Sequence, residues 1–184
     1  MKLNIFYMGL PLKEEKSNEI IHYKKYGSLK DSIQNKKSNI IIHGCSNSGK
    51  TYLIEHILKN IFGDYRPVIE DKVSFKGNKK YYIFDFSNHL KHFIIKKIDS
   101  IVRNYDHFNN DIKYIIIDNY NNISDLIQKN IKVFIEKFTD NSRFILITNK
   151  LFSIDSSCRN NCFTIRINEP NKYDKLLCRI LMVH

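Results

Sequence analysis

Short apolar runs recur five times along the chain, and each is rich in Ile, Tyr or Phe. The runs are NIIIH (39–43), YYIFDF (81–86), YIIID (114–118), FILIT (144–148) and FTIRI (163–167). Their hydrophobic positions are largely continuous instead of alternating with polar ones, which is typical of strands covered on both faces of a sheet. The pattern therefore predicts five largely buried strands.

The stretches between these runs, and the stretch after the last one, show helical spacing, with apolar residues three and four positions apart. They form four expected helix faces: Leu53, Ile54, Ile57, Leu58 and Ile61; Leu90, Ile94, Ile98 and Ile101; Ile127, Ile131, Phe134, Ile135 and Phe138; and Tyr173, Leu176, Leu177 and Ile180. Strands that alternate with helices favour a three-layer α/β fold, in which a mostly parallel five-stranded sheet has helices on both sides.

The length of 184 residues suits one domain with a sizeable core. We place that domain at residues 36–184, after an N-terminal preamble at residues 1–35. The charged segment 64–80 is interpreted as a connection that could include a short strand. We find neither an internal repeat nor a low-complexity tract in the sequence.

No apolar run approaches the ~20 residues that a membrane span needs. The first residues, MKLNIFYMGLPLKEEK, lack the layout of a signal peptide. We therefore expect an intracellular protein, nuclear or cytoplasmic, with four reduced cysteines and no membrane partner.

The first expected strand runs directly into GCSNSGKT (44–51), which fits the phosphate-loop pattern Gly-x-x-x-x-Gly-Lys-Thr. A strand before the loop and a helix after it are the context that this motif requires. The glycines let successive backbone N–H groups face a phosphate, and the helix N-terminus adds partial positive charge. We expect the whole loop to bind nucleotide, with the lysine on the β- and γ-phosphates and the threonine on Mg²⁺: Gly44, Cys45, Ser46, Asn47, Ser48, Gly49, Lys50 and Thr51.

Two further strand ends carry candidate site residues. Asp118 follows an apolar run and would complete the Mg²⁺ site in the Walker B arrangement. Asn119 then occupies the position at which hydrolysing proteins of this class usually have Glu. Because an amide cannot act as a general base, hydrolysis is expected to be slow or to need another group. Asn149, at the end of FILITN, could orient the attacking water near the γ-phosphate.

The residues after that strand bear on the choice of nucleotide. GTPases read guanine with Asn-Lys-x-Asp after a strand, whereas this chain has Asn149-Lys150-Leu151-Phe152. Because Phe152 replaces the carboxylate that guanine recognition requires, ATP with Mg²⁺ is the expected ligand.

Taken together, these motifs resemble the AAA+ module of replication factor C small subunits, the sliding-clamp loaders. The resemblance covers residues 33–170 and includes the phosphate loop, IIID, YYIFDFSNHLK, DLIQKNIKVFIEKFTDNSRFILITN and SIDSSCRNNCFTIRI, with IEKFTDNSRFILITN as its most specific part. It implies a RecA-like AAA+ P-loop fold. It also implies an ATP-binding subunit of a ring that helps to load a sliding clamp onto primed double-stranded DNA during DNA replication, with other loader subunits and the clamp as partners.

The sequence departs from this family in three places. Asn119 stands in place of the catalytic Glu. The family's Ser-Arg-Cys motif supplies an arginine finger to a neighbouring subunit, but the aligned residues here are Asn160-Asn161-Cys162. Arg159 lies two positions before the place of the finger, and we do not give it that role. The chain ends at His184, where a helical lid and an oligomerising collar would follow, so we expect either a truncated piece of a longer protein or a minimal protein in which both are absent. These departures predict a subunit that binds ATP and hydrolyses it weakly or not at all.

The net charge of +11 favours a polyanionic partner, although a general bias toward lysine codons would produce the same excess. Basic residues flank the apolar stripe of the expected helix at 88–104. They are the candidate contacts to the DNA backbone: Lys91, Lys96, Lys97 and Arg103. An ordinary charged, exposed face is the alternative interpretation.

Other activities remain open at this point. A nucleotide kinase would need an arginine-rich lid, but residues 150–170 contain only Arg159 and Arg166. A helicase loader, a packaging motor or a stand-alone P-loop NTPase is also possible, although a motor needs the missing Glu. Cys158 and Cys162 lack the paired ligands of a structural zinc site, so we interpret Cys162 as a buried thiol. The helical pair His89 and His92 is interpreted as a solvated face.

Overall fold

A seven-stranded sheet forms the centre of the protein in the computed structural model, which describes residues 23–35, 38–87, 90–104 and 112–169. Its strands are β1 (Asn39–His43), β2 (Arg66–Glu70), β3 (Val73–Gly77), β4 (Tyr81–Asp85), β5 (Lys113–Asp118), β6 (Ser142–Thr148) and β7 (Cys162–Arg166). The helices are α2 (Tyr23–Gln34), α3 (Lys50–Phe62), α4 (Lys91–Arg103), α5 (Asp125–Lys137) and α6 (Ser156–Asn160), with short 3₁₀ turns η1 (Tyr120–Asn122) and η2 (Leu151–Ser153).

Five of the strands are parallel, and they are the five that the apolar runs predict, although β7 is mostly exposed instead of largely buried. The sheet order is β2-β3-β4-β5-β6-β1-β7, and every neighbouring pair from β4 to β7 is parallel. The α/β class with a mostly parallel sheet is therefore confirmed. The carboxyl ends of the parallel strands lie along one edge of the sheet, which is where ligands bind in folds of this kind.

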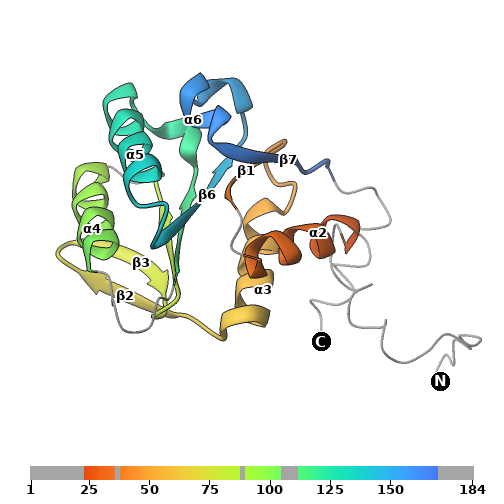
Figure 1. Cartoon of the computed structure of the whole chain (residues 1–184), viewed down its shortest axis with the longest axis horizontal. Coiled ribbons are helices and arrows are strands. Elements are labelled where there is room, and N and C mark those ends of the chain that lie inside the picture. The colour runs from red at the N-terminus through yellow and green to blue at the C-terminus, as the bar shows by residue number, and fades with distance from the viewer. Residues whose placement is uncertain (1–22, 36–37, 88–89, 105–111, 170–184) are drawn as a thin grey trace, which may run out of the picture.

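Helices cover both faces of the sheet, because successive strand residues point to opposite sides. In β1, Ile40 and Ile42 belong to the hydrophobic cluster that contains the buried residues of α2 and α3, whereas Ile41 belongs to the cluster on the other face, with the buried residues of α4 and α5. Figure 1 shows this arrangement, with α2 and α3 on one side of the sheet and α4 and α5 on the other. The predicted helices at 53–61, 90–101 and 127–138 are α3, α4 and α5. The helix expected around 173–180 lies outside the described residues.

The strand count of five is wrong by two, because segment 64–80, expected to be a charged connection that could include a short strand, forms a hairpin of two strands. Strands β2 and β3 pair antiparallel, and β3 pairs antiparallel with β4, so the hairpin extends the sheet at one edge. Asp71 and Lys72 both have positive φ at the tip, as a tight two-residue hairpin turn requires. The signal was the alternation in VSFKG, whose Val73 and Phe75 are buried while Ser74 and Lys76 are exposed.

Helix α2 is absent from the sequence-based prediction, which treated residues 1–35 as a preamble. Its Leu29 and Ile33 are fully buried against α3 and the sheet, and the Tyr114 hydroxyl donates a hydrogen bond to the Ile33 carbonyl. The hydrophobic core therefore includes residues before the boundary that we drew at residue 35. Among the α2 side chains whose burial the structure describes, those from residue 25 onward, only Leu29 and Ile33 are buried hydrophobics, which is why the periodicity of this lysine-rich helix is weak.

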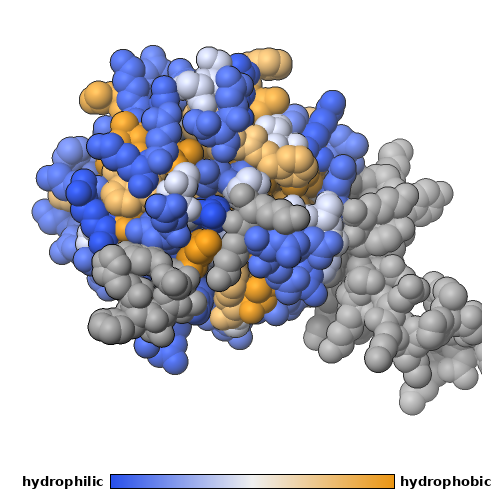
Figure 2. Space-filling model, in the orientation of Figure 1, coloured by the Kyte–Doolittle hydropathy of each residue, from blue (hydrophilic) through white to orange (hydrophobic). Residues whose placement is uncertain are grey.

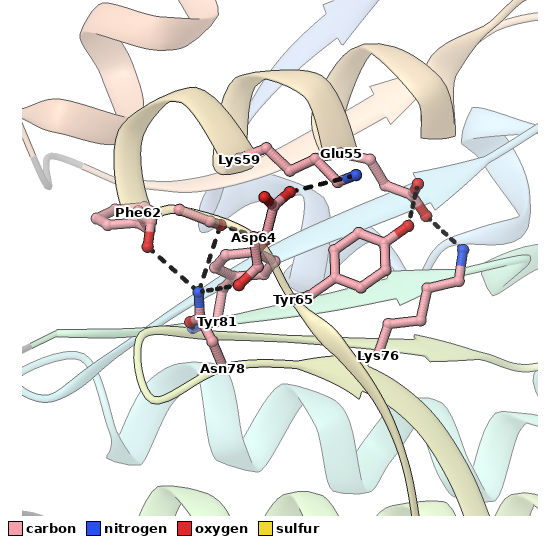
Figure 3. A network of polar contacts seen from close by, with 9 residues as sticks. Glu55, Lys59, Phe62, Asp64, Tyr65, Lys76, Asn78 and Tyr81 are labelled. Atoms are coloured by element: carbon pink, nitrogen blue, oxygen red, sulfur yellow. Dashed lines mark hydrogen bonds and ion pairs between the residues drawn. The ribbon is translucent and has the colours of Figure 1, made fainter.

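Polar contacts fix the hairpin to the carboxyl end of α3 (Figure 3). Asn78 Nδ2 donates to the carbonyls of Phe62 at 3.3 Å and Asp64 at 3.3 Å, and Tyr81 donates its hydroxyl to the Gly63 carbonyl at 2.9 Å. The Glu55 carboxylate accepts hydrogen bonds from Tyr65 at 3.1 Å and from Lys76 at 2.8 Å. These bonds join α3 to the hairpin, a contact between two segments that the sequence pattern alone does not predict.

Candidate nucleotide-binding site

The segment 44–51 connects β1 to α3 as a tight loop, as the motif predicts. Asn47 and Gly49 both have left-handed backbone conformations, and Gly49 is the N-cap of α3. A Cβ atom on Gly44 would lie 2.0 Å from the Ile167 carbonyl oxygen, so only glycine fits where the loop leaves β1. This close approach holds the start of the loop against the end of β7.

Lys50 folds back into the loop that it follows. Its side chain is buried, and its Nζ donates to the carbonyls of Gly44 at 3.0 Å and Cys45 at 2.6 Å and to the Ser48 hydroxyl at 3.2 Å. Burial lowers the pKa of Lys50, while the nearby Asp118 carboxylate opposes that shift. The ammonium group therefore lies inside the loop, where an anionic ligand would neutralise it.

Thr51 and Asp118 are in direct contact across the site. The Thr51 hydroxyl donates to Asp118 Oδ2 at 2.8 Å, and the Asn119 backbone N–H donates to Asp118 Oδ1 at 2.7 Å. Burial raises the pKa of Asp118, and these two hydrogen bonds partly offset the rise. Each oxygen of the Asp118 carboxylate thus accepts a hydrogen bond, and the two bonds together fix the orientation of the carboxylate.

The donors of this pair fit Mg²⁺. A hydroxyl and a carboxylate are hard oxygen ligands, and Mg²⁺ is usually held by one or two carboxylates together with substrate phosphates instead of a complete protein cage. Thr51 and Asp118 could therefore hold the ion beside the loop.

Asn119 lies at the same edge in a left-handed conformation, with φ of 56°. Its side-chain Nδ2 donates to Asp85 Oδ1 at 2.8 Å. Asp85 ends β4, as Asp118 ends β5, and the two residues are paired in register. Asp85 is absent from the sequence-based list of site residues. The signal that could have found it is the run YYIFDF, which places a carboxylate after four apolar residues just as YIIID does.

A cavity of about 410 Å³ is open between the loop and these strand ends. Asn149, which follows β6, lines it, so the structure brings this residue together with the loop, Asp118 and Asn119. A second cavity of about 410 Å³ is lined by the start of the loop together with Arg166 and Ile167. Asn149 lines both cavities.

The four basic residues of α4 do not form one free patch. Lys91 donates to the Asn122 carbonyl, Lys97 is paired with Glu70 of β2, and Arg103 forms hydrogen bonds to both Asp99 oxygens at 2.8 Å. Lys96 is exposed. Most of the face shown in Figure 2 is hydrophilic, interrupted by smaller apolar areas, so polar groups are spread over it.

Among the described residues, no group of three or more His, Cys, Asp and Glu side chains is arranged to hold a metal ion. Cys45, Cys158 and Cys162 are free thiols; Cys158 is the buried one, and Cys162 is only half-buried. His92 is exposed, while His89 lies outside the described residues.

Several solved structures share this fold. A DNA polymerase III gamma subunit-related protein from Thermotoga maritima superposes with a TM-score of 0.58 at 11% identity, covering 82% of this chain and 48% of that one. PCH-2 of C. elegans gives a TM-score of 0.52 at 11% identity, over 95% and 51%. EssC (ATPases 2 and 3) from Geobacillus thermodenitrificans gives 0.52 at 16% identity, over 76% and 33%.

No model of a protein family and no curated protein matches the sequence. The chain spans about half the length of the first two of these structural neighbours and a third of EssC. None of the described helices is long and apolar enough to cross a membrane. At these identities the likeness concerns the fold alone, which is a mostly parallel sheet covered by helices on both faces.

Proposed function

We propose that this chain is an ATP-binding AAA+ subunit that acts in loading a sliding clamp onto primed DNA, with weak hydrolysis of its own. The observation that carries the nucleotide part is the joint placement of Lys50 inside the loop and Thr51 against Asp118 at 2.8 Å. A phosphate ligand and its metal ion need these three groups at one edge of the sheet.

Binding would proceed by exchange of hydrogen-bond partners. Lys50 donates to three oxygens of its own loop, and phosphate oxygens would replace these acceptors with a full negative charge. The backbone N–H groups at the start of α3 would hold the same phosphates. Thr51 and Asp118 would bind Mg²⁺, which when bound neutralises charge on the β- and γ-phosphates.

The clamp-loader assignment is supported by two independent likenesses. The sequence resembles replication factor C small subunits over residues 33–170, and a DNA polymerase III gamma subunit-related protein shares the fold. Asn119, and the absence of arginine from positions 160–162, argue for a subunit that works mainly by binding. A ring can use such a member, since ATP binding can order an interface while neighbouring subunits hydrolyse.

The nucleotide part is tested by calorimetric titration of the chain with Mg-ATP and Mg-GTP. Lys50→Met should lower ATP affinity about 10- to 100-fold, which is the range for losing a hydrogen bond to a charged group. Lys59→Met, an exposed lysine on the same helix, is the matched control and should bind as the wild type does. Equal ATP affinity for Lys50→Met and wild type would contradict the site.

The assembly part is tested by affinity purification of the tagged protein from its native source, followed by mass spectrometry. Recovery of other AAA+ subunits with a sliding clamp is the expected result. Recovery of a protein that binds ATP but brings down neither would contradict the clamp-loader role and favour an independent P-loop NTPase.

Contact with the DNA backbone is part of the same proposal, and Lys96 is its best test because this lysine is exposed. Lys96→Ala should reduce the slope of log affinity against log salt by about 1, the change expected for one lost phosphate contact. Lys129→Ala on α5 is the control. An unchanged slope in Lys96→Ala, and in the double variant with Lys97→Ala, would remove α4 from the DNA interface.

A further inference from the structure

A second carboxylate lies one strand away from the expected metal ligand. Asp85 and Asp118 end neighbouring parallel strands and are paired in register. The pairing continues past the strand, because the Phe86 N–H donates to the Asp118 carbonyl at 3.1 Å. Asp85 is therefore held at the same edge of the sheet as the phosphate loop, by backbone contacts that do not depend on its side chain.

Asn119 connects this carboxylate to the candidate site. It lines the cavity beside the loop, and its side-chain amide donates to Asp85 Oδ1 at 2.8 Å. Ser87 donates to the same carboxylate through its N–H and its hydroxyl, each at 2.8 Å. Three donors therefore hold the Asp85 carboxylate at the end of β4, and one of them is the side chain of Asn119, the residue at the position where a catalytic Glu is expected.

These contacts also keep the carboxylate charged. Burial pushes the pKa of Asp85 upward, but the hydrogen bonds from Asn119 and Ser87 outweigh burial, and the pKa lies below its ordinary value. Asp85 is nevertheless exposed, so water reaches it and a proton taken up there can return to solvent. Asp118 is less suited to this task, since its oxygens face Thr51 and the Asn119 N–H.

We propose that Asp85 is the general base for ATP hydrolysis in this chain, acting on a water between its carboxylate and the γ-phosphate. The amide of Asn119 holds that base in place. In this chain the carboxylate therefore comes from Asp85 at the end of β4, and the amide comes from Asn119, which follows β5. This inference rests on the proposed binding of ATP at residues 44–51. Asp85 would then supply the general base that the amide of Asn119 cannot provide.

The step conserves every atom. A lone pair of the water oxygen forms a bond to the γ-phosphorus, and the bond from that phosphorus to the β,γ-bridging oxygen breaks, its electron pair remaining on ADP. One water proton passes to Asp85 and then to solvent, and the other stays on the inorganic phosphate. Lys50 and Asn149 would contact the phosphate and the water without accepting a proton.

The test compares four full-length proteins: wild type, Asp85→Asn, the exchanged pair Asp85→Asn with Asn119→Asp, and Asp71→Asn in the exposed hairpin turn as the control. Turnover is measured as phosphate release, and affinity is measured with a fluorescent ATP analogue. Asp85→Asn should lose about 100-fold in turnover, within the range of a general base, with ATP affinity unchanged. The exchanged pair should recover most of that loss, and the control should lose nothing.

A second readout does not depend on turnover. Mg-ADP with aluminium fluoride mimics the state in which water attacks, whereas Mg-ADP with beryllium fluoride mimics bound ATP. Asp85→Asn should lose tight binding of the first complex and keep the second.

Unchanged turnover in Asp85→Asn, or equal loss of both fluoride complexes, would overturn the role of Asp85. A wild type that binds ATP without hydrolysing it would also overturn it, yet would leave the proposed function standing. A wild type that binds no ATP would instead refute the proposed function itself.

Discussion

The Thr51 hydroxyl donates a 2.8 Å hydrogen bond to Asp118 Oδ2, joining two residues that lie 67 positions apart in the sequence. Thr51 is in the first turn of α3, and Asp118 is the last residue of β5. The bond spans the edge of the sheet from the phosphate loop to the strand end beyond β6. It therefore sets the distance between the two expected Mg²⁺ ligands before any nucleotide arrives.

Thr51→Val tests this bond, because valine keeps the shape of threonine and removes the hydroxyl. The Asp118 carboxylate would lose one of its two donors, and we expect the free energy of unfolding to fall by about 1.5 kcal/mol, as for a hydrogen bond to a charged group. Urea denaturation without nucleotide measures the change. Thr164→Val, at an exposed position of β7, is the control. Equal stability of Thr51→Val and wild type would show that the bond contributes nothing in the free protein.

Gly44→Ala should distort the phosphate loop, since the added methyl group would lie 2.0 Å from the Ile167 carbonyl oxygen. The backbone must move to relieve this overlap, and we expect a loss of about 1–3 kcal/mol in stability together with weaker ATP binding. Gly27→Ala is the matched control, and we expect it to raise the stability of the protein instead of lowering it. Its methyl group meets nothing within 4 Å, and alanine favours helix α2 by about 1 kcal/mol. Thermal unfolding of both variants gives the comparison, and a Gly44→Ala protein as stable as wild type would contradict it.

The parts of the fold that the sequence predicts well are those with strong local signals. The apolar runs ending at His43 and Asp118 are buried on both faces, so their hydrophobicity is continuous and easily found. The loop 44–51 is specified by glycines at fixed spacing, and its position between a strand and a helix follows from the flanking patterns. Asn149 could be placed at the site because it too follows a buried strand.

The parts that escaped prediction depend on contacts between distant segments. Helix α2 is anchored by two buried hydrophobics, and its burial becomes visible only when α3 is packed against it. The hairpin has an exposed edge strand, β2, in which Val68 is half-buried and the other residues, including the apolar Pro67 and Ile69, are exposed, so the strand shows no clear period of burial. Asp85 has an ordinary local sequence, and its importance arises from register with Asp118 and from the Asn119 side chain.

The stability of the protein should fall between pH 10 and pH 12 because of Tyr81. Burial raises the pKa of Tyr81 to about 12, from an ordinary value of 10.0, and its hydroxyl donates to the Gly63 carbonyl. In this range the unfolded chain loses the Tyr81 proton while the folded protein keeps it, so rising pH favours unfolding. Tyr81→Phe should make the loss of stability with pH shallower over this interval. Denaturant titrations at several alkaline pH values measure the slopes, and identical slopes for the two proteins would contradict the assignment.

Asn78 is placed to connect α3 to the hairpin through both ends of its side-chain amide (Figure 3). Nδ2 donates to carbonyls at the end of α3, while Oδ1 accepts from the N–H groups of Lys80 at 2.8 Å and Tyr81 at 3.1 Å. Asn78→Asp keeps the acceptor but replaces the donor with a carboxylate oxygen that faces those carbonyls. We expect a loss of about 1–3 kcal/mol, because the carbonyls lose their donor and the new charge is repelled by them.

Urea denaturation at pH 7 measures this loss, with Asn130→Asp on the exposed face of α5 as the control. Lowering the pH through the carboxyl range should recover part of the stability of Asn78→Asp, since the introduced carboxyl group, once protonated, can again donate to a carbonyl. The control should show no comparable recovery. If Asn78→Asp is as stable as wild type at pH 7, the hairpin is held to α3 by the Glu55 contacts and by Tyr81 instead, and the double variant with Glu55→Gln should then be the one that unfolds more easily.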